Sequence, residues 1–212
     1  MNRYTPPPPE YAWLMGGLTA ALEEGGVHHL GYRLSGPCLE YDDGSSSHWQ
    51  LLRLPGGRAV VTGFDVDFSR EQDVRELLAG GPGWLPRDWS GLTERIAFCF
   101  WWERGAGAWS SAPCPPDRGA TVTGSVHDIE DRLFERAVER SGDYDEVREV
   151  FCPRLDALVG AASEARLGEA ELTPVLAYLE DPGHLAPAAA LAVATAAGFT
   201  PGSRRPELSV AG

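Results

Sequence analysis

Apolar side chains recur with two different periods over the first part of the chain, which predicts a helix followed by strands. Between residues 11 and 24, tyrosine and leucine recur every three or four positions, as on one face of a helix, until Gly25 and Gly26 interrupt the pattern. Over residues 30–34 and 38–41 the period changes toward two, as in strands. We therefore expect an N-terminal amphipathic helix and then a β-rich segment.

Two further runs with strand character, residues 49–54 and 58–64, flank Pro55, Gly56 and Gly57. Glycine adopts positive φ angles without strain and proline favours turns, so these three residues predict a reversal of the chain. The two runs therefore predict a β-hairpin.

Residues 95–102 are apolar and aromatic on both alternating faces, which predicts a central strand buried on both sides. A Gly-Ala-Gly turn then leads to a partner strand expected near residues 108–112. Before this strand we expect a helix over about residues 70–79, because Ser69 is placed to cap its first turn and Gln72 to complete a capping box.

Beyond residue 121 the apolar pattern is helical. A first helix is expected from Val126 to Arg140, and Asp143 with Glu146 marks the start of a second. Pro153 predicts a break or kink in that second helix. Three more helices are expected over residues 155–165, 169–180 and 187–197.

Together these patterns predict an α+β fold: an N-terminal helix with a mostly antiparallel β-sheet, followed by a helical C-terminal part. We divide the chain into a proline-rich flexible arm (1–10), an α+β sheet domain (11–120), a helical subdomain packed on it (121–200) and a flexible tail (201–212). The consecutive prolines in the arm favour the extended polyproline II conformation.

The sequence contains no lysine, so its 18 basic residues are all arginines. Without an amine the chain cannot form a Schiff base with pyridoxal phosphate, complete a phosphate-binding P-loop, or supply the strand lysine of protein kinases. Isoleucine and asparagine are also scarce. This composition is typical of a GC-rich bacterial genome of the actinobacterial type.

The 31 acidic residues give a formal net charge of −13, which repels the phosphates of nucleic acids. A basic protein or a cation would be steered toward such a surface, and its association would slow with added salt. We therefore expect a protein partner, with a basic one favoured, and no direct binding of nucleic acid. The sequence leaves the oligomeric state open.

Cys38, Cys99, Cys114 and Cys152 are widely spaced and form no Cys-x-x-Cys pair, so neither a zinc ribbon nor a thioredoxin-type motif is present. The first residues lack the regions of a signal peptide, and no apolar span is long enough to cross a membrane. We expect a cytoplasmic protein with reduced thiols, no membrane segment and no cofactor.

Asp65, Asp67, Ser69, Asp73 and Glu76 have the spacing of a calcium-binding loop. The sixth position of that loop, however, holds an arginine where the sharp turn needs glycine, and helix capping explains the same residues with fewer assumptions. Asp65 and Asp67 by themselves are an alternative site for a divalent ion at a strand end. The sequence assigns no metal.

Five of the seven tryptophans cluster in the middle of the chain. One of the adjacent pair Trp101 and Trp102 is expected in the core, because neighbouring residues of a strand point to opposite faces. Trp84 and Trp89 lie on a loop rich in glycine and proline, where indoles favour binding of a partner or planar ligand. The candidate binding residues are Trp84, Trp89, Asp65 and Asp67, and no catalytic residue is assigned.

The sequence thus favours a non-enzymatic, acidic, cytoplasmic interaction protein that presents carboxylates around an aromatic patch to a protein partner, as an immunity protein, antitoxin or adaptor would. The alternative is a small enzyme or ligand-binding protein, with or without a divalent metal. Its pocket would lie between the sheet and the C-terminal helices and would use some of Asp65, Asp67, His127 and the loop tryptophans.

Overall fold

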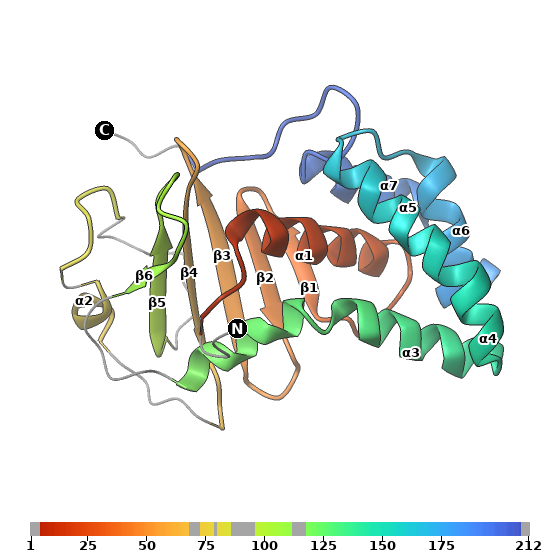
Figure 1. Cartoon of the computed structure of the whole chain (residues 1–212), viewed down its shortest axis with the longest axis horizontal. Helices are drawn as coiled ribbons and strands as arrows, with labels where there is room; N and C mark the ends of the chain where they lie inside the picture. The colour runs from red at the N-terminus through yellow and green to blue at the C-terminus, as the bar shows by residue number, and fades with distance from the viewer. Residues whose placement is uncertain (1–4, 68–72, 79, 86–95, 112–117, 209–212) are drawn as a thin grey trace.

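The computed structural model describes residues 5–67, 73–78, 80–85, 96–111 and 118–208. A helix, α1 (Pro9–Glu24), precedes a six-stranded sheet in the order β1-β2-β3-β4-β5-β6, and helices follow it (Figure 1). The α+β fold predicted from the sequence is confirmed. Among the described residues, no helix has both the length and the apolar character that crossing a membrane requires.

Every strand of the sheet is antiparallel to its neighbours, so the chain forms one continuous meander. The strands are β1 (Tyr32–Ser35), β2 (Cys38–Asp42), β3 (His48–Leu54), β4 (Arg58–Phe64), β5 (Phe98–Trp102) and β6 (Ser110–Ser111). The predicted hairpin is confirmed, with Leu54 paired to Arg58 across a turn in which Gly56 and Gly57 have φ angles of 81° and 71°. Positive φ angles strain residues that carry a side chain, so the turn needs glycine at both positions.

Helix α1 lies between the sheet and the C-terminal helices (Figure 1). Trp13, in the middle of this helix, is fully buried, and its indole Nε1–H donates to the carbonyl oxygen of Ala197 at 3.0 Å. A helix that is apolar on nearly all sides belongs in a core, and α1 contacts both layers accordingly. It is therefore the common packing element of the sheet and the helical part.

The helical part begins with a 3-10 segment, η1 (Arg118–Val126), and the helix α3 (Ile129–Ser141). It continues with α4 (Tyr144–Glu146), the π-helical turn η2 (Val147–Phe151), α5 (Cys152–Ser163), α6 (Glu169–Leu179), the 3-10 turn η3 (Pro182–His184) and α7 (Pro187–Ala196). The predicted cap is confirmed, since the Asp143 carboxylate accepts the backbone N–H groups of Asp145 and Glu146.

The break predicted at Pro153 is a π-helical turn rather than a sharp kink. Proline has no N–H, so the α-helical bond to the carbonyl four residues earlier cannot form. The backbone N–H of Cys152 instead donates to the oxygen of Val147, five residues back. The extra residue in the π-helical turn lets the helix continue into α5 without the hydrogen bond that Pro153 cannot donate.

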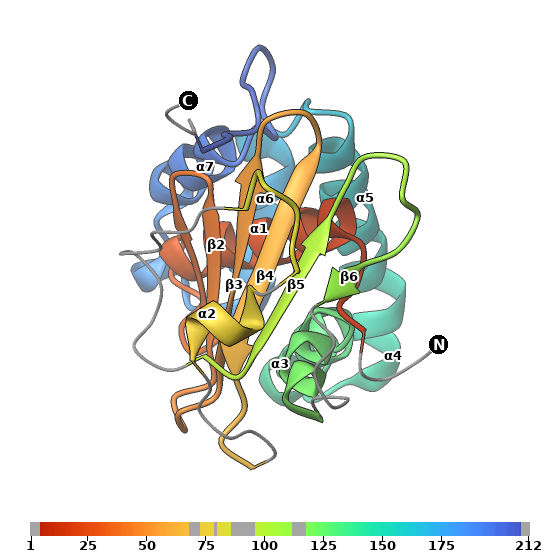
Figure 2. The ribbon, with the colours of Figure 1, turned by 90° about the vertical axis from the view of Figure 1, so that its left-hand side faces the viewer.

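A second, smaller apolar cluster covers the opposite face of the sheet. It contains Leu54, Val60, Leu77, Leu85, Ile96, Cys99 and Trp101, and the short helix α2 (Val74–Leu77) lies over this face (Figure 2). Trp101 is the buried member of the Trp101–Trp102 pair, as one of the two was expected to be. Because β5 is covered on both faces and pairs with β4 and β6, its prediction as a central strand is confirmed.

The segments expected to be flexible contact the body of the molecule where they are described. Helix α1 starts at Pro9, two residues before the predicted start, and Pro6 and Pro7 are buried. Near the other end, the Leu208 backbone N–H donates to the Arg53 oxygen at 2.9 Å. Proline is favoured in the first turn of a helix, which explains the earlier start.

Candidate functional site

A pocket of about 420 Å³ lies where α1 ends, β1 begins, β2 ends and β3 begins. We call it the carboxylate pocket. Its lining consists of Glu23, Glu24, Gly31, Tyr32, Arg33, Glu40, Tyr41, Asp42, His48, Trp49 and Gln50. Because β1 is at the edge of the sheet, side chains from both faces of the strands contribute to the same pocket.

The strand register brings these residues together. Tyr32 pairs with Tyr41, and Tyr41 with Trp49, so three aromatic rings form a row on the face toward α1. On the other face the same pairing aligns Arg33, Glu40 and Gln50. Alternation along each strand therefore puts the three rings in the core and the polar side chains on the opposite face.

Gly31 allows the chain just before β1 to approach the end of β2 closely. Its φ angle is +80°, and a Cβ atom at this position would lie 2.3 Å from the carbonyl oxygen of Asp42. The Asp42 backbone N–H also donates to the Gly31 oxygen at 2.9 Å. Any side chain at position 31 would push the two strands apart.

The pocket carries more negative than positive charge. Four of the lining side chains are carboxylates, Glu23, Glu24, Glu40 and Asp42, whereas Arg33 supplies the guanidinium. Arg33 Nη2 lies 2.6 Å from Glu40 Oε2 and forms an ion pair with it. Three carboxylates are therefore in excess over the cation in the lining.

Two of the remaining carboxylates are held in place by backbone N–H groups. Glu23 Oε2 accepts the Tyr32 N–H at 2.9 Å, and Asp42 Oδ1 accepts the Gly44 N–H at 2.8 Å. These bonds orient the side chains but bring no positive charge to them. Asp42 and Glu24 are exposed, so their charge is accessible to a ligand.

The three aromatic rings are buried in the core beside the pocket and are held in place there. The Tyr32 and Tyr41 ring centroids are 4.8 Å apart, and those of Tyr41 and Trp49 are 6.0 Å apart. Tyr32 Oη and Trp49 Nε1 each donate to Ser125 Oγ, at 3.1 Å in both cases. Ser125, just before α3, thus fixes two rings from the sheet.

Burial raises the pKa of both Tyr32 and Tyr41 above the ordinary phenol value. Both phenols are therefore protonated at neutral pH and do not act as bases. Burial likewise raises the pKa of the Cys38 thiol, on the adjacent strand, to about 12, so this thiol is not an activated nucleophile. The arrangement suits the binding of a cation better than covalent chemistry.

Asp65 and Asp67, two of the predicted binding residues, form a tight turn directly after β4. Asp65 is buried, and its Oδ1 accepts the backbone N–H of Asp67 at 3.1 Å. Phe64, the last residue of β4, pairs with His48 of the carboxylate pocket. The two aspartates therefore lie at the same end of the sheet as the pocket.

Trp84 lies at the other end of β4. Its indole Nε1–H donates to Glu103 Oε1 at 2.7 Å, and the guanidinium of Arg58, the first residue of β4, lies 5.2 Å from its ring. Strand β4 separates this indole from Asp65, so the structure does not join them in one site. Trp89 lies outside the described residues, and its binding role stays a prediction.

The calcium-loop alternative also stays a prediction, because Ser69 and the arginine and glutamine near it lie outside the described residues. His127, proposed for the ligand-binding alternative, stacks on the ring of Tyr11 with centroids 5.5 Å apart. Cys99, in the strand that was predicted to be buried on both sides, is buried, and Cys114 is outside the described residues.

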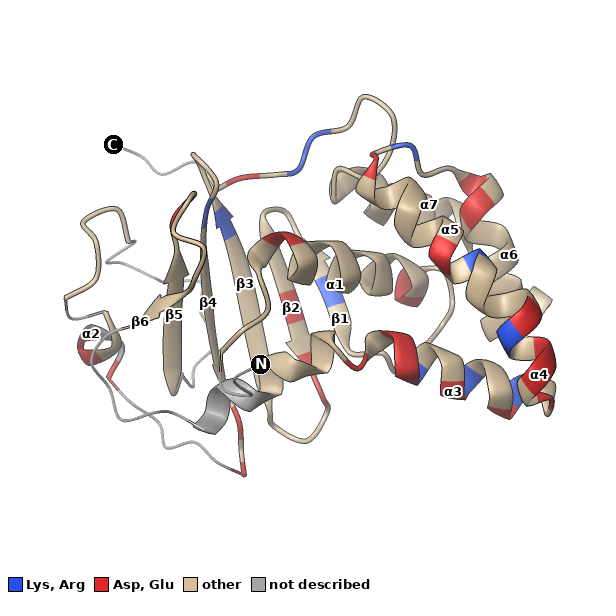
Figure 3. Cartoon of the chain, in the orientation of Figure 1, with Lys and Arg blue, Asp and Glu red and all other residues tan. Residues whose placement is uncertain are grey.

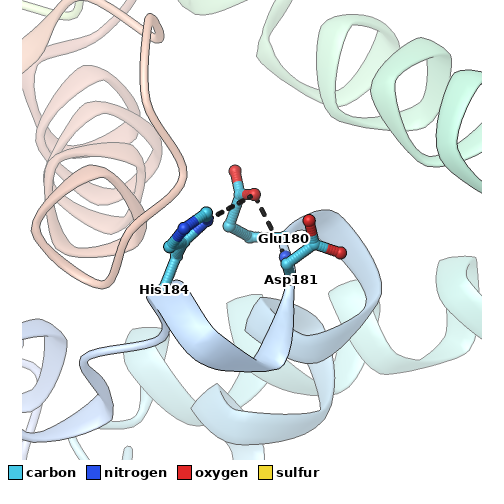
Figure 4. Close-up of side chains that lie close together, drawn as sticks. All are labelled: Glu180, Asp181 and His184. Carbon is cyan, nitrogen blue, oxygen red and sulfur yellow. Dashed lines mark hydrogen bonds and ion pairs between the residues drawn. The ribbon is translucent and has the colours of Figure 1, made fainter.

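A different cluster has the donor atoms of a metal site: Glu180, Asp181 and His184, which we call the junction cluster (Figure 4). Their ligand atoms lie within 4.8 Å of one another. However, Arg136 Nη2 is 2.9 Å from Glu180 Oε2, and Arg140 Nη2 is 2.7 Å from Asp181 Oδ1. Both carboxylates are already neutralised, so the cluster is explained as an ion-pair network.

Comparison of the chain with models of protein families, with curated proteins and with solved structures finds no match in any of the three.

Proposed function

We propose that this chain is a non-enzymatic acidic interaction protein that binds a basic segment of a partner protein. In this proposal the carboxylate pocket receives an arginine or lysine side chain of the partner. The observation that carries it is the excess of carboxylates over guanidinium in the pocket lining. Carboxylates bind cations by charge-assisted hydrogen bonds.

The dimensions of the pocket agree with a small occupant. Pockets that enclose a whole small molecule span roughly 300–1,000 Å³, and this one, at about 420 Å³, is near the lower limit. It is also open at the edge strand, which suits the end of a side chain presented by another protein. The net charge of −13 would speed the approach of such a partner at low salt.

Acidic residues outside the pocket add to the negative charge of the molecule. Figure 3 shows carboxylates on α3 and α4 interleaved with arginines, in addition to those at the end of α1 and on β2. A partner with several basic residues would be attracted by this charge, while one of its basic side chains enters the pocket. This chemistry suggests that the protein neutralises a basic toxin or acts as an adaptor.

We place this function in the cytoplasm. The described cysteines Cys38, Cys99 and Cys152 are free thiols, which suits a reducing compartment. Localisation of a tagged chain by cell fractionation tests this part separately.

The proposal is tested by titrating the protein with an arginine-rich peptide and with the same peptide in which glutamine replaces arginine. The test variant is the double substitution Glu24→Gln and Asp42→Asn, which keeps the size and one acceptor oxygen of each side chain. The matched control is Glu135→Gln with Glu139→Gln on α3, which removes the same charge from exposed positions elsewhere.

We expect the pocket variant to bind the arginine-rich peptide at least about tenfold more weakly, and the control to change the affinity less than about threefold. Equal losses in both variants would mean that only net charge matters, and the pocket assignment would be wrong. Displacement of the peptide by millimolar Mg²⁺ or Ca²⁺ would instead favour the ligand-binding alternative with a divalent ion.

A further inference from the structure

The start of the described chain lies in an apolar groove on the sheet face that also carries α1. Pro6 and Pro7 are buried there, and Trp109, just before β6, donates its indole Nε1–H to the carbonyl oxygen of Pro7 at 3.0 Å. The segment passes beside β6 before it enters α1 (Figure 2). Residues about a hundred positions apart in the sequence are thus joined by this one contact.

The conformation of this segment follows from its sequence. Residues 5 to 8 each precede a proline, which disfavours helical backbone angles and leaves the extended polyproline II region. Pro8 has φ −51° and ψ 141°, which is polyproline II geometry. Prolines have no N–H, so the segment can be recognised through its carbonyl oxygens and its ring surfaces.

The groove has the parts that recognise such a segment. Trp109 is held by an edge-to-face contact with Trp102, their ring centroids 5.5 Å apart, and Trp49 and Val126 line the floor. The space left beneath the prolines is about 10 Å³ and apolar. Pro6 and Pro7 therefore nearly fill the groove. An aromatic groove with an indole donor aimed at a proline carbonyl is how proline-rich ligands are bound by unrelated domains.

We propose that this groove is a polyproline II binding site that the chain occupies with its own residues 6–8. A proline-rich segment of another polypeptide binds by displacing this internal ligand. The groove is separate from the carboxylate pocket, although Trp49 lines both, and the proposal does not depend on the function proposed above.

The outer wall of the groove is weakly fixed, which makes displacement feasible. Strand β6 consists of Ser110 and Ser111 and pairs with β5 over these two residues. Residues 103–108 before Trp109 are exposed, and Trp109 itself is half-buried. Local opening is easiest where few apolar contacts and few hydrogen bonds between strands hold the chain.

The test uses the full-length chain and the peptide Thr-Pro-Pro-Pro-Pro-Glu, which has the sequence of residues 5–10. The substitutions Pro6→Gly and Pro7→Gly weaken the internal ligand, while Pro8 and Pro9 still start α1. The indole Nε1–H resonance of Trp109, assigned by its loss in Trp109→Phe, reports occupancy of the groove. Peptide Thr-Ala-Ala-Ala-Ala-Glu is the control ligand.

We expect the glycine variant to bind the proline peptide at least about tenfold more tightly than the wild type, because no internal ligand competes. Adding Trp109→Phe to that variant should reduce binding at least about tenfold, and the alanine peptide should bind to neither. Far-UV circular dichroism shows whether each variant is folded. If the glycine variant is not folded, the single substitution Pro6→Ala takes its place.

Failure of the folded variant to bind the proline peptide at millimolar concentration would overturn the proposal. Equal binding of the proline and alanine peptides, or binding that survives Trp109→Phe, would overturn it too, since the groove would not be the site.

Discussion

The carboxylate pocket and the junction cluster both concentrate acidic side chains, but they differ in the number of arginines that face them. In the junction cluster, Glu180 and Asp181 each have an arginine partner from α3. In the pocket, four carboxylates share Arg33. Matched charges hold helices together, whereas unmatched charges remain available for a ligand. The number of acidic residues therefore does not locate a binding site, whereas the local balance of acidic and basic side chains does.

Two arginines of α3 form ion pairs outside their own helix. Arg136 and Arg140 each follow an acidic residue of α3, Glu135 and Glu139. The structure directs them instead to the end of α6 and the turn that follows it. Arg136 Nη1 also donates to the carbonyl oxygen of His28 at 2.7 Å. This arginine therefore joins α3 both to the helical layer and to the loop before β1.

The largest effect is expected from Arg136→Met, which keeps the apolar stem and removes the guanidinium. Glu180, whose side chain is 15% exposed, would then be left without its cation. We expect the free energy of unfolding to fall by about 1–3 kcal/mol, measured by chemical denaturation. Arg33→Met is the control, because the Arg33 side chain is 75% exposed and its ion pair should be worth less than about 0.5 kcal/mol. Similar losses in both variants would contradict the distinction between the two clusters.

A smaller part of the stability should depend on pH. The backbone N–H of Asp181 and the guanidinium of Arg136 lower the pKa of Glu180, and Arg140 lowers the pKa of Asp181. Because both carboxyls have lowered pKa values in the folded state, their contribution is present above the ordinary carboxyl pKa of about 4. It is lost as the pH falls through the lower, folded values.

The difference in stability between the wild type and Arg140→Met should therefore be largest near neutral pH and shrink below about pH 4. Thermal denaturation at a series of pH values measures it. A difference that grows on acidification would show that this arginine does not stabilise the ionised form of Asp181.

A still smaller effect is expected on binding when Arg33 is removed. Arg33→Met frees Glu40 from its ion pair and increases the negative charge of the pocket. We expect the arginine-rich peptide to bind about two to five times more tightly, measured by isothermal titration calorimetry. Weaker binding would mean that Arg33 itself contacts the ligand, and the pocket would then not be a cation site.

The elements that could be predicted from the sequence are those set by local signals. The hairpin of β3 and β4 follows from its turn residues, and the start of α4 follows from the cap at Asp143. The earlier start of α1 also had a local signal, Pro9, since proline suits the first helical turn. Where one residue determines the backbone conformation around it, the element can be predicted from the sequence alone.

The candidate site was missed because no local signal joins its parts. Glu23, Tyr32, Glu40 and His48 belong to four different elements, and only the register of the strands brings them to one end of the sheet. Ser125 lies 93 residues from Tyr32, to which it is bonded. The register of β1 with β2 was the available signal, since a short turn between the two strands would place Tyr32 opposite Tyr41.

The smallest effect is expected on the stability of the pocket variant itself. Arg33 of the lining forms its ion pair with Glu40, and an asparagine at position 42 keeps one oxygen for the Gly44 N–H, so replacing Glu24 and Asp42 with Gln and Asn mainly removes repulsion between carboxylates. The free energy of unfolding should stay within about 0.5 kcal/mol of the wild type or rise slightly, although peptide binding is lost. Chemical denaturation of the variant and of the Glu135→Gln, Glu139→Gln control measures this. A loss of stability as large as that of Arg136→Met would show that the pocket carboxylates hold the fold together, as those of the junction cluster do, and that they are not reserved for a ligand.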